Sequence, residues 1–160
     1  AYPVGNIEVD SYANNNAFRG NVYTVTGHPT LDRFEMEMNY NYCTFNFFVF
    51  ERENDQQPWT LMWSEEKQAI NTTGWATSSV IGLPLETGNQ VLLGVGWNCN
   101  SAPDYFSYSS DLVTDYGIGT WAGYRSFEAN YESDGFNGFV PNSTVSASYL
   151  YRQRVFVTDL

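Results

Sequence analysis

Apolar and polar residues alternate along much of this chain, and this alternation predicts β-strands. In "RFEMEMN", Phe34, Met36 and Met38 fall on one face, while Glu35 and Glu37 fall on the other. A two-residue period of this kind is typical of a strand with one buried and one solvated face.

Further strands are predicted wherever the same period or a short apolar run recurs. "QVLLGVGW" has large apolar residues at alternate positions from Val91 to Trp97, and "WTLMWSE" alternates from Trp59 to Trp63. "FNFFVFER" is apolar on both faces toward its end, as a central strand would be. The remaining strands are expected at "IEVDSYA", "GNVYTVT", "SSVIGLPL", "GTWAGYRS" and "ASYLYRQRVFVTD". Turn residues separate these runs, for example in "TGHPT", "NTTGW" and "ETGN". Only "SEEKQAI" could form a helical turn.

About nine or ten short strands at this spacing predict an all-β fold, an antiparallel β-sandwich of jelly-roll type. The 160 residues suit one domain, residues 1–160, because this length is enough to bury a core. If the first strand, "IEVDSYA", pairs with the last, "RVFVTDL", each would cover an open edge of the other.

Composition narrows the range of partners. The chain has 18 Asp and Glu against 7 Lys and Arg, a formal net charge of −11. Nucleic acid and anionic membranes are therefore not expected as partners, because both are bound through clustered Lys and Arg. No apolar run approaches the roughly 20 residues of a membrane-spanning helix, so membrane insertion is not expected. The chain begins at Ala1 without Met, which is compatible with a secreted protein whose signal peptide has been removed.

Two cysteines, Cys43 and Cys99, stand at the edges of apolar runs. In an oxidising compartment they could pair, closing a loop of nearly sixty residues, which the chain-entropy model values at roughly 4 kcal/mol. The alternative is two separate buried thiols. "NTT" at Asn71 and "NST" at Asn142 are glycosylation sequons if the source is eukaryotic.

Catalytic chemistry is poorly represented in the chain. The single histidine, His28, cannot build a three-histidine zinc site, and neither G-x-S-x-G nor H-E-x-x-H occurs. Glu35 and Glu37 would point to the same face of a strand, as the two acids of a glycosidase could, but a solvated strand face explains them more simply. We therefore expect a non-catalytic protein, with a small β-jelly-roll glycosidase as an alternative.

The stretch "WNCNSAPDYFSYSSD", Trp97 to Asp111, places aromatic rings among amides, hydroxyls and a carboxylate directly after a buried strand. Sugars have C–H faces that stack on rings and hydroxyls that pair with short polar side chains, so this mixture is typical of a carbohydrate site. The alternative is a cap of rings on one end of the sandwich. The predicted carbohydrate-binding residues are Trp97, Asn98, Asn100, Asp104, Tyr105, Tyr108, Trp121, Tyr124 and Arg125.

Calcium is a possible cofactor of so acidic a chain, because hard cations bind several carboxylate and carbonyl oxygens. Glu8 and Asp10 of the first strand could meet Asp159 of the last if those strands pair. A second candidate group is Asp104, Asp111 and Asp115. Solvated surface acids are the alternative for both groups.

The order of several motifs resembles a type of secreted bacterial β-sandwich module. The motifs are "GNVYTVT", "PTLDRFEMEM", "FFVFERE", "WTLMWSEE", "LETGNQVLLGVGW" and "YGIGTWAG", which together span about residues 20–125. These modules resemble carbohydrate-binding and lectin-like jelly rolls attached to extracellular enzymes, adhesins or surface proteins. The resemblance implies an extracellular, non-catalytic module, and it carries no binding residue over to this chain.

The sequence therefore favours glycan binding by a secreted or cell-surface module. The alternative is a self-assembling structural subunit of an extracellular fibre, sheath or surface layer, whose loop rings are buried against a neighbouring copy. Either role would require an exposed aromatic patch.

Overall fold

The computed structural model describes residues 2–3, 16–99, 104–105, 107–108, 117–129 and 150–159. It describes the backbone alone for residues 2–3, 16, 41, 69–73, 104–105, 107–108, 120–129, 150 and 159. These residues form eleven strands, and every strand pair is antiparallel. The predicted all-β antiparallel sandwich is confirmed. Within these ranges no helix has the length and apolar character needed to cross a membrane.

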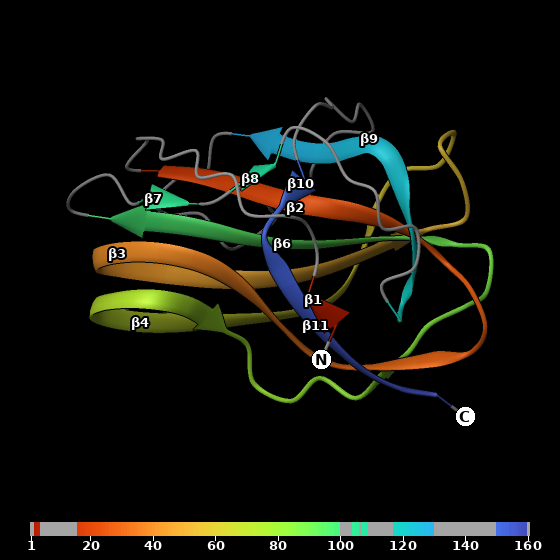
Figure 1. Ribbon diagram of the computed structural model, residues 1–160. Helices are drawn as coiled ribbons and strands as arrows, with labels where there is room; N and C mark the ends of the chain where they lie inside the picture. The colour runs from red at the N-terminus through yellow and green to blue at the C-terminus, as the bar shows by residue number, and fades with distance from the viewer. Residues whose placement is uncertain are drawn as a thin grey trace.

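Two long strands, β3 (Pro29–Arg52) and β4 (Thr60–Thr77), form a hairpin that runs to one end of the molecule, bends and returns (Figure 1). The first half of β3 pairs with β11 (Gln153–Asp159), and its second half pairs with β6 (Gln90–Cys99). The hairpin therefore belongs to both layers of the sandwich. The sequence analysis predicted separate strands here, because each half of β3 has an alternation of its own.

The bend of the hairpin divides the strands between two layers. The first layer contains β1 (Tyr2–Pro3), β11, the start of β3 and the end of β4. The second contains the rest of β3 and β4, followed by β6, β2 (Asn16–Val25) and β9 (Gly119–Ala129). Both layers thus share their longest strands, which ties the two halves of the molecule together covalently.

Four further strands have two residues each. β5 (Leu83–Pro84) and β7 (Asp104–Tyr105) pair with β3, while β8 (Ser107–Tyr108) pairs with β10 (Leu150–Tyr151). At the chain ends, β1 pairs with β11, so the two outermost described segments lie side by side. The predicted first strand, "IEVDSYA", lies outside the described residues.

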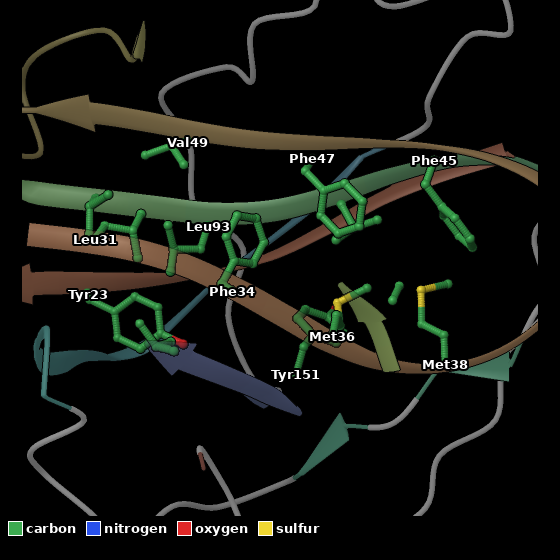
Figure 2. Close-up of a cluster of buried hydrophobic side chains, with 14 of the residues drawn as sticks. Tyr23, Leu31, Phe34, Met36, Met38, Phe45, Phe47, Val49, Leu93 and Tyr151 are labelled. Atoms are coloured by element: carbon green, nitrogen blue, oxygen red, sulfur yellow. The ribbon is translucent and has the colours of Figure 1, made fainter. Parts of the chain in front are cut away.

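The core lies between the layers. Phe34, Met36 and Met38 of the first half of β3 are buried, as their alternation predicted, and face Phe45 and Phe47 of its second half (Figure 2). The rings of Phe34 and Phe47 meet edge to face at 5.8 Å. Because the two halves of one strand supply both walls, bending β3 is enough to bring these apolar side chains together.

The outer face of the second layer is apolar and buried as well. Phe18, Phe48, Phe50 and Leu92 have no exposed surface, and the rings of Phe48 and Phe50 stack at 5.4 Å. Glycine is required at position 94, because the Phe18 ring occupies the space that a Cβ would need. The prediction that "FNFFVFER" is a central strand buried on both faces is therefore confirmed.

A buried polar network crosses the core. Asn21 of β2 donates its side-chain amide to the Tyr151 carbonyl at 2.8 Å and accepts the Tyr151 backbone N–H at 2.9 Å. The Tyr23 hydroxyl donates to the Gln153 Oε1 at 2.7 Å, and the Gln153 amide donates to the Leu93 carbonyl at 2.9 Å. These bonds satisfy polar groups that would be costly to bury alone, and they fix the register of β10 and β11 against the second layer.

Two local predictions are wrong. We predicted a possible helical turn at "SEEKQAI" and a turn at "NTTGW". Both segments are part of β4, because β4 pairs with β3 all the way around the bend. The alternation from Trp59 to Trp63 is interrupted by a register shift opposite Val49 and Phe50, and Leu61 is consequently 43% exposed. An extra residue in a strand reverses which face the following side chains occupy.

Candidate functional site

The two ends of the sandwich differ in chemistry and are named here for that difference. The disulfide end comprises residues 39–43 of β3, Trp97–Cys99 of β6 and the short strand β7. The turn end, at the opposite end of β3, comprises the β3–β4 turn, residues 53–59, and the β5–β6 turn, residues 85–89.

The disulfide end is held by the one bond that the two cysteines can form. Cys43 and Cys99 lie directly opposite each other on β3 and β6, and they form a disulfide across 56 positions of sequence. Both residues are buried. The predicted pairing is confirmed, and the alternative of two separate thiols is excluded.

The bend of β3 exposes a ring that the sequence analysis missed. Tyr42 is 55% exposed, and its φ of 51° lies in the left-handed region that bulky residues rarely adopt. Tyr40, two residues earlier, is half-buried and packs edge to face on Phe45 at 4.6 Å. The stretch "NYNYC" gives no sign of which tyrosine points outward, because the alternation on each side of it has a different phase.

Trp97 is fully buried, which contradicts its predicted role as a stacking surface. β6 does not end at the glycines before Trp97 but continues to Cys99, pairing with both β2 and β3. The indole therefore continues the buried face of Val91, Leu93 and Val95. The phase of the alternation in "QVLLGVGW" was the signal for this burial.

The remaining predicted residues of the 97–111 stretch are placed in part. Asn98 is half-buried, and the backbone of Asp104 and Tyr105 pairs with Asn39 and Met38 of β3. The backbone of Tyr108 pairs with Leu150. Asn100 lies outside the described residues, as do the side chains of Asp104, Tyr105 and Tyr108. The disulfide and β7 together bring both ends of the 99–104 stretch to the bend of β3.

The second predicted segment, which contains Trp121, lies elsewhere. Trp121 pairs with Tyr23 of β2, whereas Trp97 pairs with Ala17, which lies six residues before Tyr23 in the same strand. At about 3.3 Å per residue the two tryptophans are about 20 Å apart along the sheet. The composite site is therefore divided, with Trp121 nearer the turn end. The backbone of Tyr124 and Arg125 lies in β9 where its register with β2 is irregular, and their side chains lie outside the description.

The calcium and glycosylation predictions fall largely outside the described residues. Glu8, Asp10, Asp111, Asp115 and Asn142 are not described, and only the backbone of Asp159 and Asn71 is, each within a strand. Among the residues that the structure describes, no group of three or more His, Cys, Asp or Glu is placed to hold a metal ion.

Glu35 and Glu37, the pair considered for a glycosidase, lie on the outer side of the first layer and are engaged there. Glu37 forms an ion pair with Arg152 at 2.9 Å, and Glu35 accepts the Thr77 hydroxyl at 2.5 Å and lies 3.6 Å from Arg154. The Arg154 guanidinium also stacks on the Trp75 ring at 3.8 Å. This surface is a cross-strand ion-pair cluster, and neither glutamate lines the groove described next.

A groove of about 400 Å³ opens at the turn end. Its lining combines acidic, amide and apolar side chains, among them Glu51, Glu53, Glu86, Asn89, Pro58 and Met62. Glu51 is buried, and its Oε1 accepts the Asn89 side-chain amide at 2.9 Å and the Glu86 backbone N–H at 3.5 Å. The carboxylate at the base of the groove thus serves to hold the β5–β6 turn.

The Arg52 guanidinium, also at the turn end, is bonded to neighbouring side chains. The Arg52 guanidinium lies 4.1 Å above the Trp59 ring, its Nε donates to the Gln90 Oε1 at 2.8 Å, and it lies 3.6 Å from the Asp55 carboxylate. Trp59 is only 4% exposed. The Glu51, Arg52 and Asn89 side chains that line the groove are therefore bonded to their neighbours, and no aromatic residue is among the described side chains that line it.

Comparisons with known proteins give a likeness of fold. No protein-family model matches the sequence, and no curated protein matches it. A structure of the clostridial cysteine protease Cwp84 after propeptide cleavage superimposes with a TM-score of 0.56 at 10% identity, covering 94% of this chain and 38% of that one. A structure of the cysteine protease and lectin-like domains of Cwp84, a surface layer associated protein of Clostridium difficile, gives 0.54 at 10% identity, covering 92% and 33%. The chain thus spans 38% and 33% of the lengths of these two structures.

Proposed function

We propose that this chain is a non-catalytic, lectin-like β-sandwich module that binds a glycan at the disulfide end, in an extracellular or cell-surface protein. The likeness to a surface protein with a lectin-like domain supports this context, because an all-β chain corresponds to the lectin-like part rather than to a protease. The disulfide supports it too, because such bonds persist in oxidising compartments.

The observation that carries the proposal is the convergence at the disulfide end. The exposed ring of Tyr42, the half-buried amide of Asn98 and the backbone of Asp104 and Tyr105 all belong to one end of the sandwich. A covalent crosslink fixes the two main strands there. Rings and short polar groups on a rigid support are what sugar recognition requires.

The test is retardation in native gels that contain soluble polysaccharide, after a printed glycan array has ranked the ligands. The probes are a mixed-linkage β-glucan, a galactomannan and a polygalacturonate. We expect wild type to be retarded by at least one of them, and Tyr105→Ala to be retarded less, because one proposed stacking ring is removed.

Trp121→Ala is the matched control, because its backbone lies about 20 Å from Trp97 along the sheet. We expect this variant to be retarded as wild type is. Retardation of neither wild type nor variants would refute glycan binding, and loss in Trp121→Ala alone would place the site at the other end.

A structural subunit is the second candidate, and the edge of the sheet favours it. β4 pairs only with β3 among the described strands, and Leu61 and Met62 near its start are 43% and 42% exposed. An edge strand with exposed apolar side chains is suited to pairing with another chain. Light scattering at increasing concentration separates the candidates, because a subunit would assemble while a glycan-binding module would remain a monomer.

A further inference from the structure

We propose that Tyr42 is the principal aromatic contact of the glycan site and that the ligand is a neutral glycan. This inference rests on the proposed function and deepens it by naming a residue and a ligand class. Among the aromatic side chains that the structure describes, only that of Tyr42 is exposed, at 55%.

The position of Tyr42 has a structural reason, which is the bend. Before it, even-numbered residues such as Met36 and Met38 face the core, and after it, odd-numbered residues such as Phe45 and Phe47 do. The phase therefore reverses across residues 40–43, where β3 passes from one layer to the other. A left-handed residue at position 42 accomplishes this reversal.

The bend explains the backbone but not the ring. Glycine adopts a φ near +51° without steric cost, and asparagine adopts it more readily than tyrosine does. Among the described residues with positive φ, all but Tyr42 are glycines, so the chain places a bulky ring in a conformation that it otherwise assigns to glycine. Strain of this kind, together with an exposed ring, points to recognition rather than to folding.

The surroundings of Tyr42 suit a carbohydrate. The next residue, Cys43, is bonded to Cys99, so the segment that carries the ring is covalently anchored. Three residues before it, Asn39 pairs with Asp104, which brings the backbone of the predicted binding segment to about 10 Å along the strand. A ring fixed on a rigid backbone loses little conformational freedom when it stacks on a sugar.

Charge selects the class of glycan. The chain carries a net charge of −11, and the described cations are engaged, with Arg52, Arg152 and Arg154 paired to carboxylates and Arg33 over the Phe156 ring. A polyanionic glycan would be repelled by this field and would find no free cationic cluster among those residues. A neutral glycan meets neither penalty.

The experiment compares Tyr42→Gly with wild type in gels containing neutral β-glucan or galactomannan. Tyr42→Gly removes the ring and also relieves the left-handed strain, so we expect its melting temperature to equal or exceed that of wild type while its affinity falls about tenfold or more. Tyr42→Phe keeps the ring and is expected to keep the affinity. Met62→Ala, an exposed side chain at the turn end, is the matched control and is expected to bind as wild type does.

Failure of the inference and failure of the proposed function give different results. If wild type binds no glycan, glycan binding itself is refuted. If wild type binds a neutral glycan and Tyr42→Gly binds it equally well, glycan binding stands and the role of Tyr42 is refuted. Retardation of wild type by polygalacturonate alone would overturn the neutral class.

Discussion

The two ends of this sandwich use polar and aromatic residues in opposite ways. At the turn end, Trp59 is covered by Arg52, and Glu51 accepts hydrogen bonds from its own neighbours. At the disulfide end, the Tyr42 side chain is exposed to solvent, and its backbone has a left-handed conformation that is unfavourable for tyrosine. The turn end contains a groove of about 400 Å³, but the polar side chains of Glu51, Arg52 and Asn89 that line it are bonded to their neighbours.

A groove alone does not identify a binding site in this molecule. The turn groove owes its shape to two turns that must be held in place, and its buried carboxylate does the holding. The disulfide end is held by a covalent bond, so its exposed ring is not required for stability. Substitutions should therefore separate stability from binding differently at the two ends.

Removing the disulfide is expected to have the largest effect on stability. Replacing both Cys43 and Cys99 by alanine opens a loop that spans 56 positions, and the chain-entropy model predicts a loss of about 4 kcal/mol in the free energy of unfolding. Urea unfolding measures this loss. Hydrogen exchange should rise most at the disulfide end, near Trp97 and Cys43, and least near Gln90.

Chemical reduction of wild type is the control, because it breaks the same bond without changing the packing residues. It should lower the unfolding midpoint to a similar degree. A loss below about 1 kcal/mol in both experiments would mean that the sheet alone fixes this end, and the contrast between the two ends would disappear.

At the turn end, Glu51→Ala is expected to reduce stability without affecting glycan binding. The Asn89 amide and the Glu86 backbone N–H lose their shared charged acceptor, which costs about 1–2 kcal/mol. Glu53→Ala in the same groove is the matched control, since Glu53 is exposed, and its effect should stay within about 0.5 kcal/mol. Loss of glycan retardation in Glu51→Ala would move the binding site to the groove.

The ion-pair cluster between the two ends should give the smallest effect. The side chains of Arg152 and Glu37 are 21% and 24% exposed, and a partly solvated single ion pair is expected to contribute about 1 kcal/mol. A double-mutant cycle with Glu37→Gln and Arg152→Gln measures the coupling, which should fall further as salt increases. A coupling above about 2 kcal/mol would indicate that this face is desolvated.

Much of the fold was predictable because alternation reports burial directly. Phe34, Met36 and Met38 face the core as their spacing requires, and the two-faced apolar run from Phe45 to Phe50 is a central strand. Alternation also contained the correct answer for Trp97, which has the same phase as Val91, Leu93 and Val95. For Trp97 the phase of the alternation, and not its polar sequence neighbours, indicates burial.

The candidate site was predictable only in part, because it depends on where a strand bends. The sequence indicated the 97–111 stretch, and the backbone pairing of Asp104 and Tyr105 brings that part of it to the end that also exposes Tyr42. Nothing in "NYNYC" distinguishes Tyr40, packed on Phe45, from Tyr42 in solvent. The separation of Trp121 from Trp97 likewise depends on strand register, which sequence spacing does not reveal.

The sequence by itself determined that this chain is all-β, which side of most strands faces the core, and which two cysteines could form a bond. These properties follow from local side-chain alternation and from there being only two thiols. Tertiary structure alone decided that one strand serves both layers, that a left-handed tyrosine marks the crossing, and that the predicted site divides between two ends. The reason is that the bending and register of strands depend on how residues distant in sequence pack against each other, and a local sequence pattern does not determine that packing.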